Sequence, residues 1–451
     1  MNKKSIFWFR QDLRTFDNNG FIKSIENSDS IFPIFILDKN IIPGFLGLSD
    51  KKFLFLKEAL INLDNQLKKL GGKLTIFHDY PENIIPEICK KYDINTIYAN
   101  KSYSRYGKSR DEKIENYCME NNITFILEND YLLNEPNEIE QRKVFTPYFK
   151  LWKKQLIGKE IVLQEAKQFN QINNPHPKLP PYQGEGIEHL LDKLIKGYRH
   201  PYFTIDFGKD RLEKFDFKHY ESFRNDLDLD GTSRLSVYLR FGIFSVREVY
   251  LKVKDESETF ISELAWREFW QHIDYYFPFT KKYEFQENKR HIKWKSDTEL
   301  FQKWCEGKTG YPVVDAAMKQ LLETNWMHGR ARMIVASFLT KDLLIDWRLG
   351  EEFFKKHLLD YDENVNFGNW QWSASVGADP KPLRIFNPCL QSEKFDKKAK
   401  FIRKYLPVLE TADIKAIHNP IDNKLDYIDM IVNHNEAQKI AREMYKNKTE
   451  N

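Results

Sequence analysis

The sequence predicts two structurally different parts: an α/β amino-terminal domain with a parallel five-stranded sheet, and a large all-α carboxyl-terminal domain. Strand-length apolar runs alternate with helical patterns over the first 130 residues, whereas helical patterns dominate from about residue 184. The length of 451 residues leaves room for two or three domains. We therefore expect a sheet domain at 1–130, a connector at 131–183 and a helical domain at 184–451.

Five short apolar runs are the candidate strands of the first domain. They are Ser5–Phe9, Ile31–Leu37, Leu74–His78, Thr96–Tyr98 and Ile123–Leu127, and the helical patterns between them are Lys52–Leu70, Glu82–Lys91 and Ser109–Asn121. Parallel sheets of this kind bind ligands at the carboxyl ends of their strands. The loop Arg10–Asn18 follows the first strand and is therefore a candidate ligand-facing loop. No GxGxxG or Walker A pattern supports a dinucleotide or P-loop site.

The pattern changes after residue 130. Six prolines interrupt the segment 131–183, which is typical of a connection that crosses between domains. The helical runs that follow are Glu188–Lys196, Glu258–Tyr276, Tyr311–Asn325, Gly329–Leu344 and Asn435–Tyr445. Strand signals are sparse in this part, so we expect one helical domain.

Charge, cysteine usage and hydropathy exclude several classes of protein. The chain has 70 Lys and Arg against 66 Asp and Glu, which leaves room for a local basic patch without indicating nucleic-acid binding. The four cysteines lie far apart, so neither a disulfide framework nor a thiolate metal site is expected. The apolar run after Lys4 stops at Arg10, and no run reaches the roughly 18 residues of a membrane span. We expect a cytoplasmic protein without a membrane segment.

Aromatic residues make up 15% of the chain, which excludes a disordered protein. Eight of the ten tryptophans lie between Trp266 and Trp372. A large aromatic core would explain this cluster, and any proposal of function has to account for it as well.

Two motifs place hydroxyl or charged groups beside expected helices. In Gly231–Ser236 two hydroxyl residues follow a glycine where a helix is expected to begin, which suits either a phosphate or an ordinary helix cap. On the expected helix 258–276, Glu263 and Trp266 share a face that would suit a flat ligand with polar edges. The alternative is a surface ion pair between Glu263 and Arg267.

Two further motifs combine glycine or acids with aromatic rings. Gly329 and Met333 lie one turn apart on an expected helix, where glycine costs about 1 kcal/mol relative to alanine. Such a glycine suggests the close approach of a bulky group or of another helix. The segment Asp360–Trp372 is dense in acids, amides and rings. Its paired carboxylates indicate a metal or general acid/base site, or simply a polar surface loop.

Seven motifs together carry a family resemblance. They are FWFRQDLRTFDN, GTSRLSVYLRFG, ELAWREFW, GYPVVDAAMKQL, WMHGRARMIVASFLTKDLLIDWR, NWQWSAS and RIFNP, in that order between residues 5 and 407. They resemble the DNA photolyase and cryptochrome family, and within it the bacterial class I cyclobutane pyrimidine dimer photolyases. The resemblance implies a deoxyribodipyrimidine photo-lyase, in which excited reduced FAD passes an electron to a flipped-out dimer in UV-damaged DNA.

The resemblance implies an FAD site in the helical domain. The positions that match phosphate contacts are Tyr220, Thr232, Ser233, Arg234, Leu235 and Ser236, and those that match contacts to the flavin and ribose are Trp266, Arg267, Trp326, Arg332, Asp360 and Asp362. Asp342 matches a carboxylate that is expected to pair with Arg332. Asn366 matches the residue beside the flavin N5 atom, where photolyases carry Asn and plant and insect cryptochromes carry Asp or Cys.

The resemblance also divides the tryptophan cluster. Trp370, Trp347 and Trp294 match an electron relay that runs from the flavin to the surface. Trp266 and Trp372 match the walls of the lesion cavity, where stacking is worth about 1–3 kcal/mol per base.

Other positions match contacts to the lesion and to DNA. Glu263 matches a glutamate that hydrogen-bonds the carbonyl edge of the dimer, and Met333 matches a side chain that lines the same cavity. Arg330, Gln391 and Lys394 match contacts to the lesion strand. The last two lie in the segment 380–404, which holds eight Lys and Arg against two acids. That local excess suits a phosphate backbone, although a solvated surface would explain the segment as a whole.

Two positions depart from the class I pattern. Gly329 stands where Asn is usual beside the flavin and lesion, which puts repair efficiency in doubt, and Gln11 replaces a usual Arg. The alternatives are a cryptochrome-like blue-light photoreceptor and a (6-4) photolyase, whose two histidines would stand at Gly329 and Met333. A flavin oxidoreductase lacks a nicotinamide fingerprint here, and a DNA-binding module would not need the relay motif.

A second, antenna chromophore remains open as a folate, a deazaflavin or a flavin. The segments Arg10–Arg14 and Lys101–Asp111 could face any of these. We expect a monomer, as is usual in the family.

Overall fold

A computed structural model describes residues 3–41, 51–172, 200–380 and 383–446. The chain forms two compact units from segments that alternate along the sequence. The first unit comprises Met1–Glu135, Leu156–Phe215 and Arg234–Asp255, and the second comprises Pro136–Gln155, Asp216–Ser233 and Glu256–Asn451. The domain ranges 1–130, 131–183 and 184–451 stay a prediction, and the expected helix Glu188–Lys196 lies outside the described residues.

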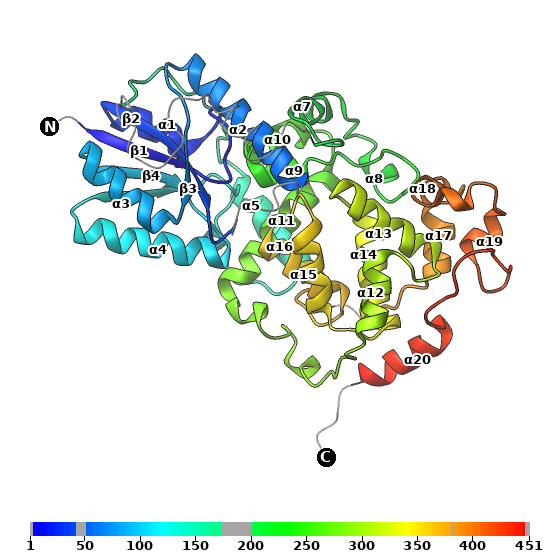
Figure 1. Ribbon diagram of the computed structural model, residues 1–451. Coiled ribbons are helices and arrows are strands. Elements are labelled where there is room, and N and C mark those ends of the chain that lie inside the picture. The colour runs from blue at the N-terminus through cyan, green and yellow to red at the C-terminus, as the bar shows by residue number, and fades with distance from the viewer. Residues whose placement is uncertain (1–2, 42–50, 173–199, 381–382, 447–451) are drawn as a thin grey trace. The chain divides into compact units, whose positions relative to one another are not determined.

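The first unit contains the predicted parallel sheet. Its strands are β1 (Lys4–Phe9), β2 (Ser30–Asp38), β3 (Thr75–Asp79), β4 (Thr96–Asn100) and β5 (Thr124–Glu128). They pair in the order β3-β2-β1-β4-β5, and every pair is parallel (Figure 1). Each of the five predicted apolar runs forms one strand, so the sheet prediction is confirmed.

Helices cover both faces of this sheet. The first unit as a whole contains the helices α1 (Asn19–Asn27), α2 (Lys51–Lys69), α3 (Pro81–Tyr92), α4 (Arg105–Glu120), α7 (Ile205–Lys214), α9 (Ser236–Phe241) and α10 (Val246–Val253). Apolar residues of α3 and α4 pack against Ile6, Trp8 and Ile97 on one face. On the other face, Phe21 of α1 contacts the rings of Phe7 and Phe9.

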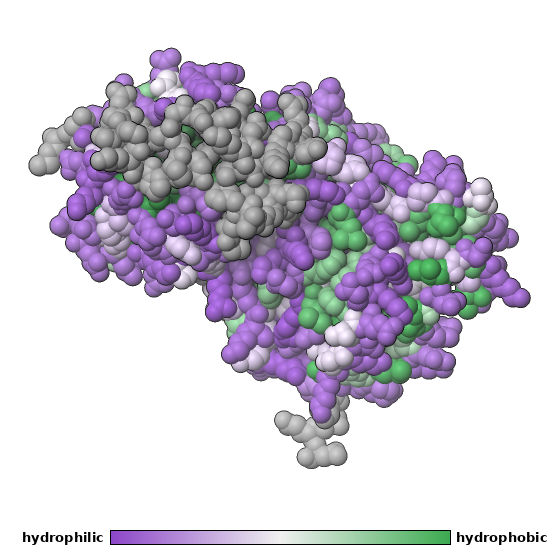
Figure 2. All heavy atoms as spheres, viewed as in Figure 1, coloured by the Kyte–Doolittle hydropathy of each residue, from purple (hydrophilic) through white to green (hydrophobic). Residues whose placement is uncertain are grey.

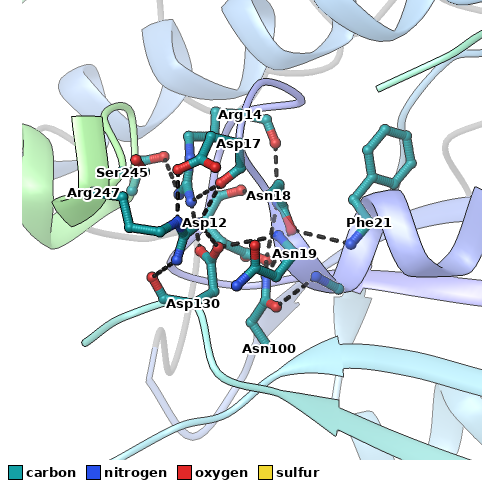
Figure 3. Close-up of polar contacts among 12 residues, drawn as sticks. Asp12, Arg14, Asp17, Asn18, Asn19, Phe21, Asn100, Asp130, Ser245 and Arg247 are labelled. Atoms are coloured by element: carbon teal, nitrogen blue, oxygen red, sulfur yellow. Dashed lines mark hydrogen bonds and ion pairs between the residues drawn. The ribbon is translucent and has the colours of Figure 1, made fainter. Parts of the chain in front are cut away.

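A buried polar network joins four segments of the first unit, namely the loop after β1, the end of β4, Asp130 and α10 (Figure 3). Asn100, at the end of β4, donates to Asp12 and to Asn18, which caps α1. Asp130 pairs with Arg14 and with Arg247 of α10, each at 2.7–2.8 Å. Burial alone would raise the pKa of Asp130, but the two guanidinium groups hold it below its ordinary value. The loop after β1 is therefore largely committed to internal contacts from Asp12 to Asn18.

The second unit is helical, as predicted. Its longer helices are α5 (Phe145–Leu156, ending at the unit boundary), α11 (Glu258–Tyr276), α12 (Thr298–Glu306), α13 (Pro312–Thr324), α14 (Gly329–Ser337), α15 (Trp347–His357), α16 (Glu363–Ser373), α17 (Pro388–Phe395) and α20 (His434–Met444). Its short elements are η1 (Pro136–Glu138), α8 (Tyr220–Phe223), η2 (Pro278–Lys281), η3 (Glu287–Lys289), the π-helix η4 (Phe338–Asp342), α18 (Lys400–Tyr405), η5 (Pro407–Leu409) and α19 (Ile414–His418).

Local sequence explains where the helix that carries Glu263 and Trp266 begins. The side chain of Ser257 accepts from the Phe260 N–H and caps α11, which begins at the next residue as predicted. The expected single helix 329–344 is wrong in its second half. The α-helix ends at Ser337, η4 follows, and Leu344 has a left-handed φ of 60°, which no α-helix continues.

Candidate active site

Asn366 is held in one orientation by Glu351. The Asn366 Nδ2 donates to the Glu351 Oε1 at 3.0 Å and to the Glu351 backbone oxygen at 3.2 Å. A backbone oxygen only accepts, so the amide nitrogen must face Glu351 and the Asn366 Oδ1 points elsewhere. Both side chains are buried, and burial raises the pKa of Glu351 to about 7.

Arg332 pairs with Asp360 rather than with Asp342. The Arg332 Nη2 lies 2.9 Å from an Asp360 carboxylate oxygen, and its Nε donates to the Met327 backbone oxygen. Asp342, in η4, instead bonds to the Nδ1 of His434. The predicted pairing of Asp342 with Arg332 is therefore wrong, because ten residues of helix, about 15 Å at 1.5 Å per residue, separate the two positions along α14 and η4.

The acids of the segment 360–372 have partners of their own. Asp362 caps α16 by accepting from the Val365 N–H, and it also accepts from Gln271 of α11. Gln271 in turn accepts from Asn364. Within the described part of the chain no group of three or more His, Cys, Asp and Glu could hold a metal ion.

The predicted phosphate-binding run has a different local structure from the one expected. The helix α9 begins at Ser236, not at the hydroxyl pair Thr232 and Ser233, because Arg234 has a left-handed φ of 57°. Thr232 and Ser233 belong to the second unit, while Arg234, Leu235 and Ser236 belong to the first. Tyr220, also predicted for this site, is buried at the start of α8.

Glu263 and Trp266 lie on one face of α11, each with a neighbour that the sequence did not indicate. The Glu263 carboxylate pairs with Arg224 at 2.6 Å, so an ion pair with Arg267 is not needed to balance its charge. Burial raises the pKa of Glu263, and Arg224 acts in the opposite direction. Trp266 stacks on Phe145, with ring centroids 3.7 Å apart and planes 7° from parallel.

Met333 and Trp372 line one cavity of about 430 Å³, open solvent included. Lys341 lies in its wall and donates to the backbone oxygens of Ser373 and Arg384 at 2.6 and 2.7 Å. Burial lowers the pKa of Lys341 to about 7. The cavity therefore combines an indole, a thioether and a buried amine, which suits a flat ligand with polar edges.

Gly329 is exposed, on the same face of α14 as Met333 and one turn before it. A Cβ built at Gly329 meets nothing within 4 Å among the described residues. The expected close approach of another helix is therefore not present there, and the space beside Gly329 is open.

The three tryptophans that the resemblance assigns to a relay range from buried to partly exposed positions in the second unit. Trp370 of α16 and Trp347 of α15 are buried, whereas Trp294 is half-buried. Trp370 lies against Gly350, one turn after Trp347, where a Cβ would stand 2.2 Å from the indole. A bridge between Lys295 and Ile345 brings the neighbour of Trp294 beside the start of α15. The electron relay stays a prediction.

Arg330 and Lys394, two of the three residues predicted to contact DNA, lie against one ring, and Gln391 lies near them in sequence. The guanidinium of Arg330 lies 4.3 Å and the ammonium of Lys394 lies 5.3 Å from the centroid of Phe395. Gln391 is one turn before Phe395 on α17. Figure 2 shows hydrophobic side chains exposed on the face of the second unit that carries α13 and α16.

Comparisons with known proteins show the family of the chain. The family model of the FAD-binding domain of DNA photolyase matches residues 260–447, and the DNA photolyase model matches residues 5–169. The chain belongs to the DNA photolyase family. It is 34% identical to the deoxyribodipyrimidine photo-lyase of Alkalihalophilus pseudofirmus, and the alignment covers 97% of each chain.

Solved structures of this family share the fold of the protein. An archaeal photolyase from Sulfolobus tokodaii with two FAD molecules has a TM-score of 0.87 and 33% identity, and the match covers 98% of this chain and 100% of that one. The cryptochrome of Synechocystis has a TM-score of 0.85 and 26% identity, with 98% and 99% coverage. The FAD-binding match lies within the second unit, which also holds Asn366, Glu263 and the relay tryptophans.

Sequence reasoning missed several residues around this photolyase site. Glu351 holds Asn366, Arg224 pairs with Glu263, and Phe145 covers one face of Trp266. Only Glu351 left a signal, since it stands four residues after Trp347 and so shares a helix face with it.

Among residues 3–41, 51–172, 200–380 and 383–446, no helix is long and apolar enough to cross a membrane.

Proposed function

We propose that this photolyase repairs cyclobutane pyrimidine dimers in DNA. The observation that carries the proposal is the cavity that Met333 and Trp372 line together, because a flipped-out lesion needs a hollow with an aromatic wall. The polar surface of Arg330, Gln391 and Lys394 supports binding of the damaged strand. We propose that the protein acts as a cytoplasmic monomer.

The side chains of the second unit fit the polar edge of a flavin. Asn366 offers a carbonyl oxygen, and the Arg332–Asp360 pair offers a donor and an acceptor. Bound reduced FAD would supply the light-excited electron donor of the repair reaction. Trp266, Arg267, Trp326 and Asp362 are proposed as further flavin or ribose contacts, and Tyr220 with Thr232–Ser236 as phosphate contacts. Asp342 is also proposed as an FAD contact. Its structural partner is His434, and it does not pair with Arg332.

The chain's own residues have separate roles in this proposal. Glu263 hydrogen-bonds the carbonyl edge of the dimer, donating to a carbonyl oxygen when it is protonated or accepting from the adjacent ring N–H when it is ionised, and Arg224 keeps its carboxyl group oriented. Trp266 and Trp372 confine the dimer by stacking. Asn366 accepts at the flavin N5 position, since its nitrogen is bonded to Glu351.

A second chromophore is proposed for the carboxyl edge of the first unit's sheet. The Arg10 guanidinium pairs with Asp111 and lies 5.0 Å from the centroid of Trp8. The predicted segments Arg10–Arg14 and Lys101–Asp111 therefore meet there. The Sulfolobus tokodaii photolyase structure contains two FAD molecules, which favours a flavin among the three candidates.

A repair assay tests the proposed function. Reduced holoprotein is illuminated with blue light in the presence of oligonucleotides that carry one cyclobutane dimer, one (6-4) photoproduct or no lesion. We expect only the cyclobutane dimer to be restored, and only in the light. Repair of the (6-4) lesion alone would overturn the proposed substrate. Photoreduction of the bound flavin without any repair would favour the cryptochrome alternative, to which the Synechocystis neighbour also points.

A matched pair of variants on α11 sharpens this assay. Glu263→Gln removes the carboxylate expected at the dimer and should lower the rate of repair about hundredfold. Glu258→Gln removes an exposed carboxylate at the start of the same helix, where it pairs with Lys153, and should leave the rate unchanged. Equal rates for both variants would remove Glu263 from the proposed site.

A further inference from the structure

Trp347, the middle ring of the proposed relay, has a carboxylate at its indole nitrogen. The Trp347 Nε1 donates to the Glu284 Oε1 at 3.3 Å, and both side chains are buried. Arg348 pairs with the same Glu284 oxygen at 3.0 Å. Burial alone would raise the pKa of Glu284, but its bonds to Arg348 and Trp347 hold it below the ordinary value. Glu284 is therefore ionised at neutral pH.

The position of Glu284 is fixed from both sides by one side chain. Gln371 accepts from the Phe285 N–H at 2.9 Å and donates to the Tyr283 backbone oxygen at 3.1 Å. Gln371 directly follows Trp370 on α16 and is itself buried. The segment that carries Glu284 is thus clamped to the helix that carries the first relay ring.

Trp304 offers a competing route from Trp370. Its ring lies 6.3 Å from that of Trp370, with the planes at 70°. The Trp304 Nε1 donates to the backbone oxygen of Val335 at 3.1 Å. Within the described part of the chain, the other rings recorded against Trp304 are those of Phe301, Phe353 and Phe354. Trp304 is fully buried in this apolar setting, which disfavours a positive charge.

The charges around Trp347 favour a positive indole. Arg348 lies 4.6 Å from the centroid of the Trp347 ring and would by itself oppose such a charge. Arg348 also pairs with Asp346, so two carboxylates surround one guanidinium. The negative charge of Glu284 also acts on Tyr445. Together with burial, it raises the pKa of the Tyr445 hydroxyl. The ring of Tyr445 lies 6.1 Å from that of Trp294.

We propose that Glu284 directs the oxidising equivalent from Trp370 to Trp347, and away from Trp304, by holding negative charge at the Trp347 indole nitrogen. One electron passes from the Trp347 indole to the Trp370 radical cation, which becomes neutral, and Trp347 becomes the radical cation. No bond breaks and no proton leaves in this step. The oxidant of Trp370 is a photoexcited oxidised flavin, so the inference rests on the proposed function.

Three substitutions at or near Glu284 separate charge from shape. Glu284→Gln keeps the length and an oxygen acceptor for the Trp347 nitrogen but removes the charge. We expect it to lower the yield of long-lived tryptophan radical, measured by transient absorption after a flash, about tenfold. Glu284→Asp keeps the charge and should stay closer to wild type. Glu287→Gln removes an exposed carboxylate three residues later, which pairs with Arg290, and should have no effect.

Three ring variants, Trp370→Phe, Trp304→Phe and Trp347→Phe, distinguish failure of this inference from failure of the proposed relay. Trp370→Phe should abolish the long-lived radical, and if it does not, the relay itself is wrong. If Trp370→Phe does so while Glu284→Gln behaves as wild type, the role of Glu284 alone is overturned. Trp304→Phe should leave the radical yield undiminished. A loss as large as that in Trp347→Phe would place the route through Trp304 and would also overturn the proposal.

Discussion

In the first unit, Arg14 is buried together with Asp17 and Asp130, Arg247 is largely buried beside them, and each guanidinium faces a carboxylate. In the second unit, the buried Glu351 side chain accepts from the Asn366 amide and the Tyr361 hydroxyl. Among the described residues, no Lys or Arg forms an ion pair with it. The difference appears in the pKa values. That of Asp130 lies below its ordinary value, whereas that of Glu351 is raised to about 7.

Buried charge that stabilises the fold therefore differs from buried charge at the candidate site. A neutralised cluster stabilises one arrangement and has no group that titrates near neutral pH. A carboxyl group poised near pH 7 is typical of sites where protons or electrons move. The second arrangement occurs beside Asn366, the residue expected at the flavin.

Arg247→Met gives the largest expected effect, in the first unit. It leaves the fully buried Asp17 carboxylate without its cation and should lower the free energy of unfolding by about 3–5 kcal/mol. Urea unfolding measures this value. Lys23→Met removes the exposed cation of the Lys23–Glu128 pair and should change it by less than about 1 kcal/mol. A similarly small change for Arg247→Met would mean that the network does not hold the fold.

Glu351→Gln tests the second unit through pH dependence. Because the folded-state pKa of Glu351 is raised, protonated Glu351 stabilises the fold fully below pH 4.5, and this contribution is lost as the pH rises through about 7. The free energy of unfolding of the wild type should therefore fall by about 1–3 kcal/mol more than that of Glu351→Gln between pH 5 and pH 8. The exposed neighbour Glu352, changed to Gln, should keep the wild-type slope. Parallel curves for wild type and Glu351→Gln would contradict a raised pKa.

Lys394→Ala gives the smallest expected effect and concerns binding alone. Loss of one phosphate contact should reduce the slope of log affinity for DNA against log salt by about one, without changing the unfolding midpoint. Fluorescence anisotropy with a labelled dimer-containing duplex measures the slope. Lys303→Ala, on α12 and paired with Glu299, is the matched control and should retain the wild-type slope. A slope unchanged by Lys394→Ala would place the DNA elsewhere.

Regular elements of the fold were predictable where local signals agreed. The alternating runs of residues 4–128 predicted all five strands, and the cap residue Ser257 marks the start of α11. The helix α1 was missed because its first residues, Asn19 and Gly20, are typical of loops. The π-helix η4 was missed because its apolar pattern continues that of α14.

Site geometry was predictable only where residues share an element. The common face of Glu263 and Trp266 follows from their spacing on the expected helix 258–276. The contacts of Arg332 with Asp360, Trp266 with Phe145 and Trp347 with Glu284 join segments far apart in sequence. No periodicity links such pairs, because tertiary packing alone decides which segments meet.

The alternation of segments between the two units has a consequence for synthesis of the chain. When residues 1–135 have left the ribosome, Asp17 and Asp130 still lack Arg247, which is made more than a hundred residues later. The second unit begins with residues 136–155 and ends beyond α20. The first unit can therefore finish folding only after residue 255 is made, when two segments of the second unit are already synthesised, and the second unit completes its fold last.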